Sequence, residues 1–282
     1  MEIYKEQVFA KAKVNLALHV LGRRVDRYHF LDSLVVFPKI KDRLLIKEAS
    51  DFSFTIGGEF SEFINPEENS VIKAFNLVRS QLPSNFSIHL EKNIPVGAGL
   101  GGGSADSAAV LRFFQRKYKA EIPKNEIIAQ IGADVPVCLS DKFQRVKGIG
   151  EITEEISETG FQLWIVLVNP AVNVSTGEIF ESLRERENKG LEDFKSFKTS
   201  KNFIDYLSRQ RNDLQSVACE KHPEIKFVLE KIMETENNLL TRMTGTGSTC
   251  FGLYSKMEDA FRAQENLEKK FTNWWVKYTK IF

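Results

Sequence analysis

Cysteine is scarce in this chain of 282 residues, and its thiols are far apart in the sequence. Only Cys138, Cys219 and Cys250 are present. An odd number of widely separated cysteines argues against a disulfide framework and against a zinc cage built from paired thiolates. The sequence therefore predicts a protein of a reducing compartment, and we expect it in the cytoplasm.

Long apolar runs are missing as well. Residues 1–10 contain no apolar core of the kind found in secretory signals, and no stretch of about 18 uninterrupted apolar residues occurs anywhere. We therefore expect a chain that is neither exported nor inserted into a membrane.

Neither sign of charge is in excess. Lysine and arginine number 39 against 38 aspartate and glutamate residues, for a formal net charge of +1. A protein without a global positive field is not expected to gather nucleic acid or an anionic membrane surface. Any anionic ligand must therefore be held by a local device. Oligomeric state is left open between monomer and weak dimer.

The chain does contain a regular mixture of period-2 and period-3.6 patterns, which predicts an α+β fold. Its length suggests two domains, and the pattern restarts near residue 160, so we divide the chain into 1–159 and 160–282. The expected helices are 69–81, 104–118, 124–131, 178–187, 223–234 and 257–270. The expected strands are 8–12, 14–21, 29–37, 43–47, 52–56, 86–91, 135–139, 144–147, 161–168, 239–243, 250–254 and 274–281.

A glycine-rich segment runs from Pro95 to Ser104, directly before a predicted helix that Ser104 is expected to cap. Five glycines occupy the seven positions 97–103. Glycine allows several backbone amides to converge on one anion, and the start of a helix adds unpaired amides and a positive dipole end. The alternative is a flexible capped loop. No Gly-Lys-Ser/Thr follows, so this is not the lysine-containing phosphate loop. We favour polyphosphate binding.

A second glycine pair, Gly245 and Gly247, lies between two predicted strands. By itself it reads as a hairpin turn. When it is considered together with the first loop, we interpret this glycine pair as part of the same ligand-binding site. If the first loop binds the phosphates of a nucleotide for a kinase reaction, the protein must also hold an acceptor beside them.

Phosphoryl transfer needs positioning, charge neutralisation and a carboxylate that receives the acceptor's proton. Asp134 lies in a turn of the segment Gly132-Ala133-Asp134-Val135-Pro136, and Lys13 lies inside an apolar strand. A lysine between Ala12 and Val14 is costly to bury without an anion. The alternatives are an edge-strand charge for Lys13 and a turn-capping acid for Asp134.

Together these segments resemble the GHMP kinase superfamily of galactokinase, homoserine kinase, mevalonate kinase and phosphomevalonate kinase. They are most similar to the branch whose acceptor is a cytidine-diphosphate alcohol of the non-mevalonate isoprenoid route. The motifs that carry the resemblance lie at 12–16, 22–24, 26–29, 95–104, 132–136, 148–151, 169–170 with 174–176, 212–214 and 243–247. The resemblance implies an N-terminal ATP-binding domain like the second domain of ribosomal protein S5 and a C-terminal ferredoxin-like α/β sandwich.

The resemblance also implies the activity and its residues. ATP with Mg²⁺ would phosphorylate the 2-hydroxyl of the acceptor by direct in-line transfer in a bacterial cytoplasm, with Asp134 as base and Lys13 beside it. Its metal ligands stay unassigned. The implied acceptor-binding residues are Asn15, Tyr28, His29, Thr176 and Phe180. The implied ATP-binding residues are Asn69, Lys92, Pro95, Gly97, Ala98, Gly99, Leu100, Gly101, Gly102, Gly103 and Ser104.

Three positions depart from the pattern of the superfamily branch. Arg27 stands where glycine is usual, Ala105 replaces a serine, and Ser248 replaces a common proline. None is a residue with a proposed chemical role, so we expect activity to survive. The rival interpretations are a GHMP kinase with another acceptor, a non-catalytic nucleotide sensor on the same fold, and a nucleic-acid-binding protein with an S5-like domain.

Overall fold

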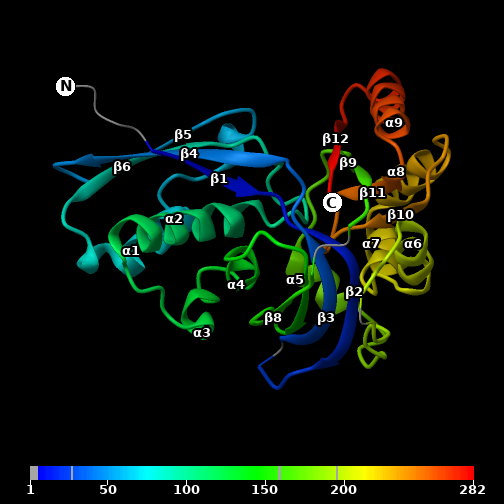
Figure 1. The fold of residues 1–282 in the computed structure, drawn as a ribbon, viewed down its shortest axis with the longest axis horizontal. Coiled ribbons are helices and arrows are strands. Elements are labelled where there is room, and N and C mark those ends of the chain that lie inside the picture. Colours follow the sequence, from blue (N-terminus) through cyan, green and yellow to red (C-terminus); the bar gives the residue numbers. More distant parts are fainter. Residues whose placement is uncertain (1–5, 27, 158–159, 195) are drawn as a thin grey trace. The chain divides into compact units, whose positions relative to one another are not determined.

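The computed structural model describes residues 6–26, 28–157, 160–194 and 196–282, which form two compact units (Figure 1). Each unit is assembled from separate stretches of the chain. Unit 1 consists of Met1–Lys13, Ile40–Val96 and Gly101–Asp141, and unit 2 of Val14–Lys39, Gly97–Leu100 and Lys142–Phe282. The domain boundary between 159 and 160 stays a prediction, and Thr159 lies outside the described residues.

Unit 1 contains a four-stranded sheet with the order β1-β4-β6-β5. Its strands are β1 (Glu6–Lys11), β4 (Lys41–Ala49), β6 (Asn85–Glu91) and β5 (Ser53–Gly57). All pairs are antiparallel except β5 with β6. In β6 alternate residues are buried, as the period-2 pattern of the sequence predicts.

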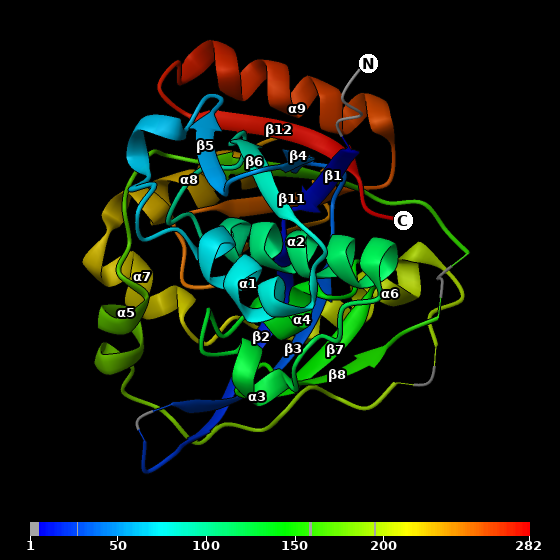
Figure 2. The same cartoon turned by 90° about the vertical axis from the view of Figure 1, so that its left-hand side faces the viewer.

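Two helices of unit 1, α1 (Ser70–Val78) and α2 (Gly102–Tyr118), lie side by side against one face of this sheet (Figure 2). Phe75, Phe86 and Phe114 join the two helices to β6. Their ring centroids lie 4.8 to 6.2 Å apart, at the offset and edge-on geometries that aromatic rings prefer. This aromatic core fixes α2, and with it the residues at its start.

Four shorter elements complete unit 1: η1 (Ser61–Phe63), η2 (Arg79–Gln81), α3 (Asn125–Ile128) and α4 (Val135–Cys138). The strand predicted at 135–139 is wrong, because this segment is the helix α4. Its residues are buried on every side, so their apolar run carries no period, and Pro136 suits the first turn of a helix, where no amide is needed.

Unit 2 contains two sheets, and the first has the order β2-β3-β7-β8. Its strands are β2 (Val14–Arg23), β3 (His29–Val36), β7 (Gln144–Gly148) and β8 (Ile152–Glu155). Every pair is antiparallel, and the pairing of β2 with β3 shifts register twice. Lys13 was predicted inside a strand; it lies instead in the break between β1 and β2.

The second sheet of unit 2 has the order β10-β11-β9-β12, with all neighbours antiparallel. Its strands are β9 (Trp164–Asn169), β10 (Leu240–Met243), β11 (Cys250–Tyr254) and β12 (Trp275–Lys280). Helices α8 (Pro223–Met233) and α9 (Met257–Lys270) pack on it. A β-α-β-β-α-β run with this strand order is the ferredoxin-like arrangement that was predicted.

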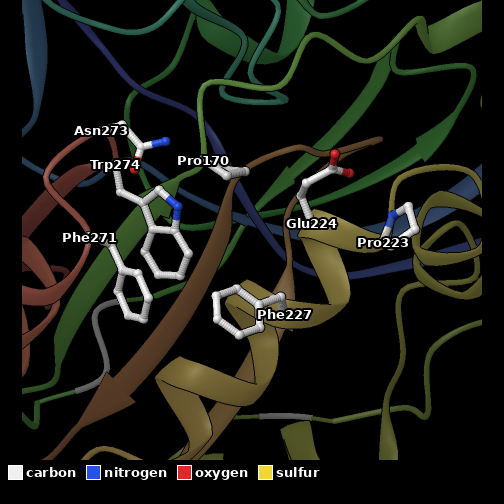
Figure 3. Close-up of a pocket in the computed structure, with 7 residues that line it drawn as sticks. All are labelled: Pro170, Pro223, Glu224, Phe227, Phe271, Asn273 and Trp274. Atoms are coloured by element: carbon white, nitrogen blue, oxygen red, sulfur yellow. The ribbon is translucent and has the colours of Figure 1, made fainter.

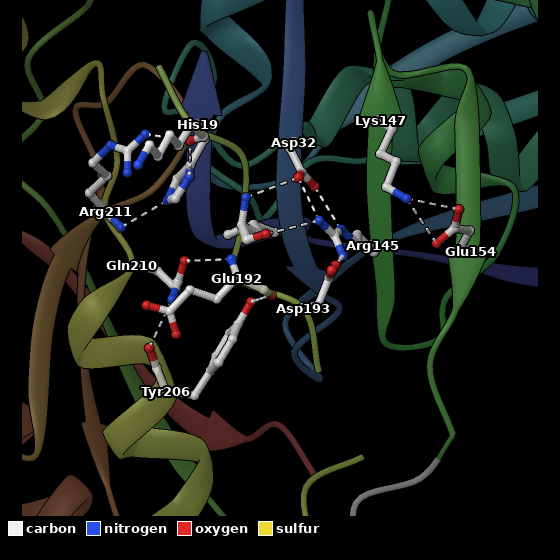
Figure 4. Close-up of polar contacts among 12 residues, drawn as sticks. His19, Asp32, Arg145, Lys147, Glu154, Glu192, Asp193, Tyr206, Gln210 and Arg211 are labelled. Atoms are coloured by element: carbon white, nitrogen blue, oxygen red, sulfur yellow. Dashed lines mark hydrogen bonds and ion pairs between the residues drawn. The ribbon is translucent and has the colours of Figure 1, made fainter. Parts of the chain in front are cut away.

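Three further helices lie between β9 and α8: α5 (Thr176–Ser182), α6 (Ser200–Arg209) and α7 (Gln215–Lys221). The helix predicted at 178–187 ends early, at Ser182. The charged stretch after it is held by polar contacts rather than by helical structure (Figure 4). Asp32 accepts hydrogen bonds from Arg145 and from the amide of Leu191, and the Tyr206 hydroxyl donates to the carbonyl of Glu192.

Among the described residues, no helix combines the length and the apolar character needed to cross a bilayer.

Candidate functional site

Lys13 and Asp134 form an ion pair within unit 1. The Lys13 Nζ lies 2.8 Å from Oδ2 of Asp134, and the exposed fractions of the two side chains are 6% and 40%. Burying an ammonium is costly unless an anion accompanies it, and Asp134 is such an anion. A carboxylate that is open to solvent and backed by a buried cation is suited to receive a proton from a bound hydroxyl.

Gly101 lies against this pair. It is the N-cap residue of α2 and has a φ of +62°, in the left-handed region. A Cβ atom added to it would stand 3.1 Å from Cε of Lys13 and 3.6 Å from Oδ2 of Asp134. Glycine therefore permits both the backbone conformation and the close approach. Ser104, which was predicted to cap α2, lies within its first turn.

The first turn of α2 consists of Gly102, Gly103 and Ser104. The first amides of a helix have no carbonyl partner within it, and the helix dipole places partial positive charge there. The Gly103 carbonyl accepts hydrogen bonds from the Ser70 and Ser107 hydroxyls, which fixes the turn from both sides. Within unit 1, this arrangement has the chemistry of an anion site next to a carboxylate.

The middle of the glycine-rich segment, Gly97–Leu100, belongs to unit 2 and is supported by the second glycine loop. The amide of Thr249 donates to the carbonyl of Ala98 at 3.3 Å. A Cβ on Gly99, whose φ is +72°, would lie 2.7 Å from the carbonyl oxygens of Thr244 and Gly247. A Cβ on Gly245 would likewise meet the carbonyl oxygen of Gly99, at 2.9 Å. The two predicted loops are therefore packed backbone to backbone.

Asn15 and Thr176 both connect to this second loop within unit 2. Asn15 is buried. Its backbone N–H donates to Thr244 Oγ1 at 2.9 Å, and its side-chain Nδ2 donates to Ser33 Oγ at 2.8 Å. Oγ1 of Thr176 lies 3.2 Å from Oγ1 of Thr246. Thr176 was predicted from the sequence, whereas Thr244, Thr246 and Ser33 were not, since their contacts depend on segments that meet only in the fold.

His29 and Phe180 are brought together by β3 and α5. Their rings are stacked, with centroids 4.9 Å apart and an interplanar angle of 24°. His29 is 6% exposed, and its Nε2 has no hydrogen-bond partner among the described residues. Burial, together with the positive charges of Arg23 and Arg186, lowers the pKa of His29, so the ring is neutral at pH 7. Tyr28, next to it, is 54% exposed.

Two residues predicted near the adenosine have partners in unit 1. Asn69 caps α1, accepting from the amide of Val71 at 2.9 Å. Lys92 is 2% exposed, and its Nζ contacts both Asp42 and Asp106. Neither aspartate was named from the sequence, because nothing in its local pattern indicates a partner 14 or 50 residues away.

The structure describes two of the three residues that depart from the family pattern. Arg27 lies outside the described residues. Ala105 is buried in α2, where a small side chain is accommodated. Ser248 donates a 2.5 Å hydrogen bond to the carbonyl of Val172, so the hydroxyl has a structural use of its own.

A hollow in unit 2 is lined largely by aromatic side chains. Phe271 and Trp274 stack in it at 4.0 Å, and Phe227 meets both rings edge-on (Figure 3). Pro170, Pro223, Glu224 and Asn273 complete its lining, which includes none of the predicted site residues. In the described part of the chain, no group of three or more histidine, cysteine, aspartate or glutamate residues is placed to hold a metal.

Comparison with known proteins identifies both halves of the chain. Residues 69–142 match the GHMP kinases N terminal domain, and residues 180–273 match the GHMP kinases C terminal domain. A 4-diphosphocytidyl-2-C-methyl-D-erythritol kinase of Chelativorans sp. (strain BNC1) is 40% identical, covering 98% of this chain and 96% of the relative. One of Dinoroseobacter shibae is 41% identical, covering 97% and 94%.

Solved structures agree with these relatives. The crystal structure of a 4-(cytidine 5'-diphospho)-2C-methyl-D-erythritol kinase superposes with a TM-score of 0.78 at 30% identity, covering 97% of this chain and 98% of the other. Homoserine kinase from Cytophaga hutchinsonii has a TM-score of 0.66 at 15% identity, covering 99% and 94%, and shares the fold. The predicted fold class and resemblance are thereby confirmed. The chain belongs to the GHMP kinases, in the family of the 4-diphosphocytidyl-2-C-methyl-D-erythritol kinases.

Proposed function

We propose that this protein transfers the γ-phosphate of ATP to the 2-hydroxyl of 4-diphosphocytidyl-2-C-methyl-D-erythritol, in the non-mevalonate isoprenoid pathway. One observation carries the proposal: Gly101, at the start of α2, packs against the Lys13–Asp134 pair. The amides that suit a phosphate and the carboxylate that suits a proton are therefore neighbours within one compact unit. The family supplies the identity of the acceptor.

The reaction is a direct in-line transfer and needs no phosphoenzyme. Asp134 accepts the proton of the attacking hydroxyl, and Lys13 steadies the negative charge that develops on that oxygen. Asn15, two residues beyond Lys13 in the chain, orients the acceptor. We leave the protein ligands of the Mg²⁺ that accompanies ATP unassigned.

The glycine loop binds the phosphates through its backbone. Unpaired amides at the start of α2 attract the polyphosphate without a lysine in the loop, which suits a protein with nearly balanced charge. We assign to ATP the residues of the predicted set, namely Asn69, Lys92, Pro95, Gly97, Ala98, Gly99, Leu100, Gly101, Gly102, Gly103 and Ser104. The second loop, with Gly245 and Gly247, supports Gly99.

The cytosine ring is recognised by His29, with Tyr28, Phe180 and Thr176 around it. A neutral histidine with an unpaired buried nitrogen can hydrogen-bond the Watson-Crick edge of a base, while aromatic rings supply stacking energy. An acceptor without a base would leave these groups nothing to bind. We place the enzyme in the bacterial cytoplasm, as a monomer or weak dimer.

A coupled ADP-release assay tests the function directly. The purified chain is supplied with ATP, Mg²⁺ and, separately, the cytidylyl substrate, mevalonate, homoserine or galactose. ADP release with the cytidylyl substrate and not with the other three is the expected result. Release with one of the other acceptors would identify a different GHMP kinase, and release with none would leave a nucleotide-binding sensor.

Replacing His29 with alanine is expected to raise the KM for the cytidylyl substrate about 10- to 100-fold, since a lost base contact is worth about 1–3 kcal/mol. The KM for ATP should stay within about twofold of wild type. His89→Ala is the matched control, because His89 contacts Thr55 in unit 1. Parallel rises in both KM values would count against the assignment of His29.

The lowered pKa of His29 predicts how the enzyme responds to acid. A histidine of ordinary pKa, about 6.5, would be half protonated at that pH. His29 is held neutral by burial and by Arg23 and Arg186, so its NMR titration should fall below 6.5. The KM for the cytidylyl substrate should accordingly begin to rise, as the pH falls, at a lower pH than it would with a histidine of ordinary pKa. A His29 midpoint at or above 6.5 would contradict this.

A further inference from the structure

Three ionisable groups are buried together behind the start of α2 in unit 1. Nζ of Lys92 lies 2.5 Å from Oδ2 of Asp42 and 2.7 Å from Oδ2 of Asp106. The exposed fractions of the three side chains are at most 3%. Removing charges from water is expensive, so a buried cluster of this kind has to be held by good geometry on every side.

Asp42 connects this cluster to the segment that leads into the glycine loop. Its Oδ1 accepts hydrogen bonds from the amides of Asn93, at 2.6 Å, and Ile94, at 2.8 Å. These two residues immediately precede Pro95. One carboxylate of β4 therefore fixes both the ammonium of Lys92 and the backbone that follows it.

Asp106 connects the cluster to α2, within the first two turns of the helix. Gly102, the first residue of that helix, also lies beside the ammonium, since a Cβ added to it would stand only 2.8 Å from Nζ of Lys92. The ammonium thus touches the turn whose amides carry the proposed phosphate site. Its two carboxylate partners come from β4 and from α2 itself.

We infer that Asp42, Lys92 and Asp106 are positioning residues that hold the first turn of α2, and so its unpaired amides, in place for the phosphates of ATP. This inference rests on the proposed function and revises one part of it. Lys92 acts through the backbone of the glycine segment, and its ammonium is engaged by two carboxylates rather than by the nucleoside.

The contacts of the two carboxylates indicate which substitution at position 106 preserves the cluster and which one disrupts it. Asp42 accepts from one ammonium and two amides, whereas Oδ1 of Asp106 has no hydrogen-bond partner among the described residues. Burial, opposed by Lys92 and reinforced by Asp42, raises the pKa of Asp106 to about 7. An asparagine at 106 therefore resembles the neutral carboxyl and keeps an oxygen for Lys92, while an alanine removes the contact.

The test is ATP binding measured by calorimetry without acceptor, followed by steady-state kinetics. Asp106→Ala should weaken ATP binding about tenfold or more, the scale of a lost charged hydrogen bond. Its KM for the cytidylyl substrate should stay within about twofold, and Asp106→Asn should restore ATP affinity to within about threefold of wild type. Glu91→Gln, which loses the half-exposed pair with Arg43 next to the cluster, is the control and should bind ATP normally.

If Asp106→Ala does not fold, two glycine variants in the first turn of α2 test the inference instead. Gly102→Ala drives a methyl group into Nζ of Lys92, whereas Gly103→Ala meets only the Ser70 hydroxyl at 3.5 Å. A larger loss of ATP affinity in the first variant supports the inference, and equal losses overturn it. Wild-type ATP affinity in Asp106→Ala would also overturn it while leaving the kinase function standing. A wild-type chain that binds no ATP would instead refute the proposed function.

Discussion

Replacing Asp134 with asparagine is expected to lower kcat by about 100-fold or more, the usual scale for a positioned general base. The KM for ATP should stay nearly unchanged, because the phosphates are held by backbone amides. Asparagine has the size of aspartate and keeps an oxygen toward Lys13, so the buried ammonium retains a partner. The measurement is kcat and both KM values from the coupled ADP-release assay.

Asp141→Asn is the matched control for this experiment. Asp141 forms a comparable ion pair in unit 1, with its Oδ2 2.6 Å from Nζ of Lys11. Neither residue of that pair is among the closest neighbours of a Cβ at Gly101, which are Lys13 and Asp134, so kcat should stay within about twofold of wild type. Turnover in Asp134→Asn equal to that of wild type would remove Asp134 from its role as base.

The parts of the site that the sequence predicted are those encoded by a local signal. The glycine loop is recognisable from its composition, and Lys13 is conspicuous as a lysine between apolar neighbours. Asp134 was found because a carboxylate next to glycines satisfies a chemical requirement of phosphoryl transfer. The ion pair between Lys13 and Asp134, 121 positions apart in the chain, shows that the two local signals belonged together.

The parts that could not be predicted depend on contacts between distant segments. Asp42 and Asp106 look like ordinary acidic residues in the sequence, and only the pairing of β4 with β6 and the packing of α2 bring them to Lys92. The same holds for Thr244, which meets Asn15 from 229 positions away. The placement of Lys92 near the nucleoside stays a prediction, and the sequence did not show that its ammonium is paired with two carboxylates inside the unit.

The fold was predictable where one face of an element is buried and the other is not. β6 alternates buried and half-buried residues, and its bounds match the expected strand closely. α4 is buried throughout, so the periodicity of its apolar residues could not distinguish a strand from a helix there. Helices α6 and α7 were missed because they follow a charged stretch without a regular apolar pattern, although α6 itself buries Phe203, Tyr206 and Leu207 at helical spacing.

Replacing Gly99 with alanine is expected to raise the KM for ATP about 10- to 100-fold and to destabilise the protein by about 1–3 kcal/mol. An alanine would have to adopt the left-handed φ of +72°, and its methyl group would meet two backbone oxygens at 2.7 Å. Those oxygens belong to the second glycine loop and cannot rotate away as a side chain could. The loop must therefore shift, and its amides with it.

The effect on stability is measured by urea unfolding and the effect on ATP by steady-state kinetics. Gly22→Ala is the control, because its methyl group would meet only Phe30, at 3.8 Å, an ordinary contact. That variant should keep the wild-type KM for ATP and lose little stability. A Gly99→Ala enzyme with wild-type affinity for ATP would mean that Gly97–Leu100 does not contact the phosphates, and the nucleotide would then be held by the start of α2 alone.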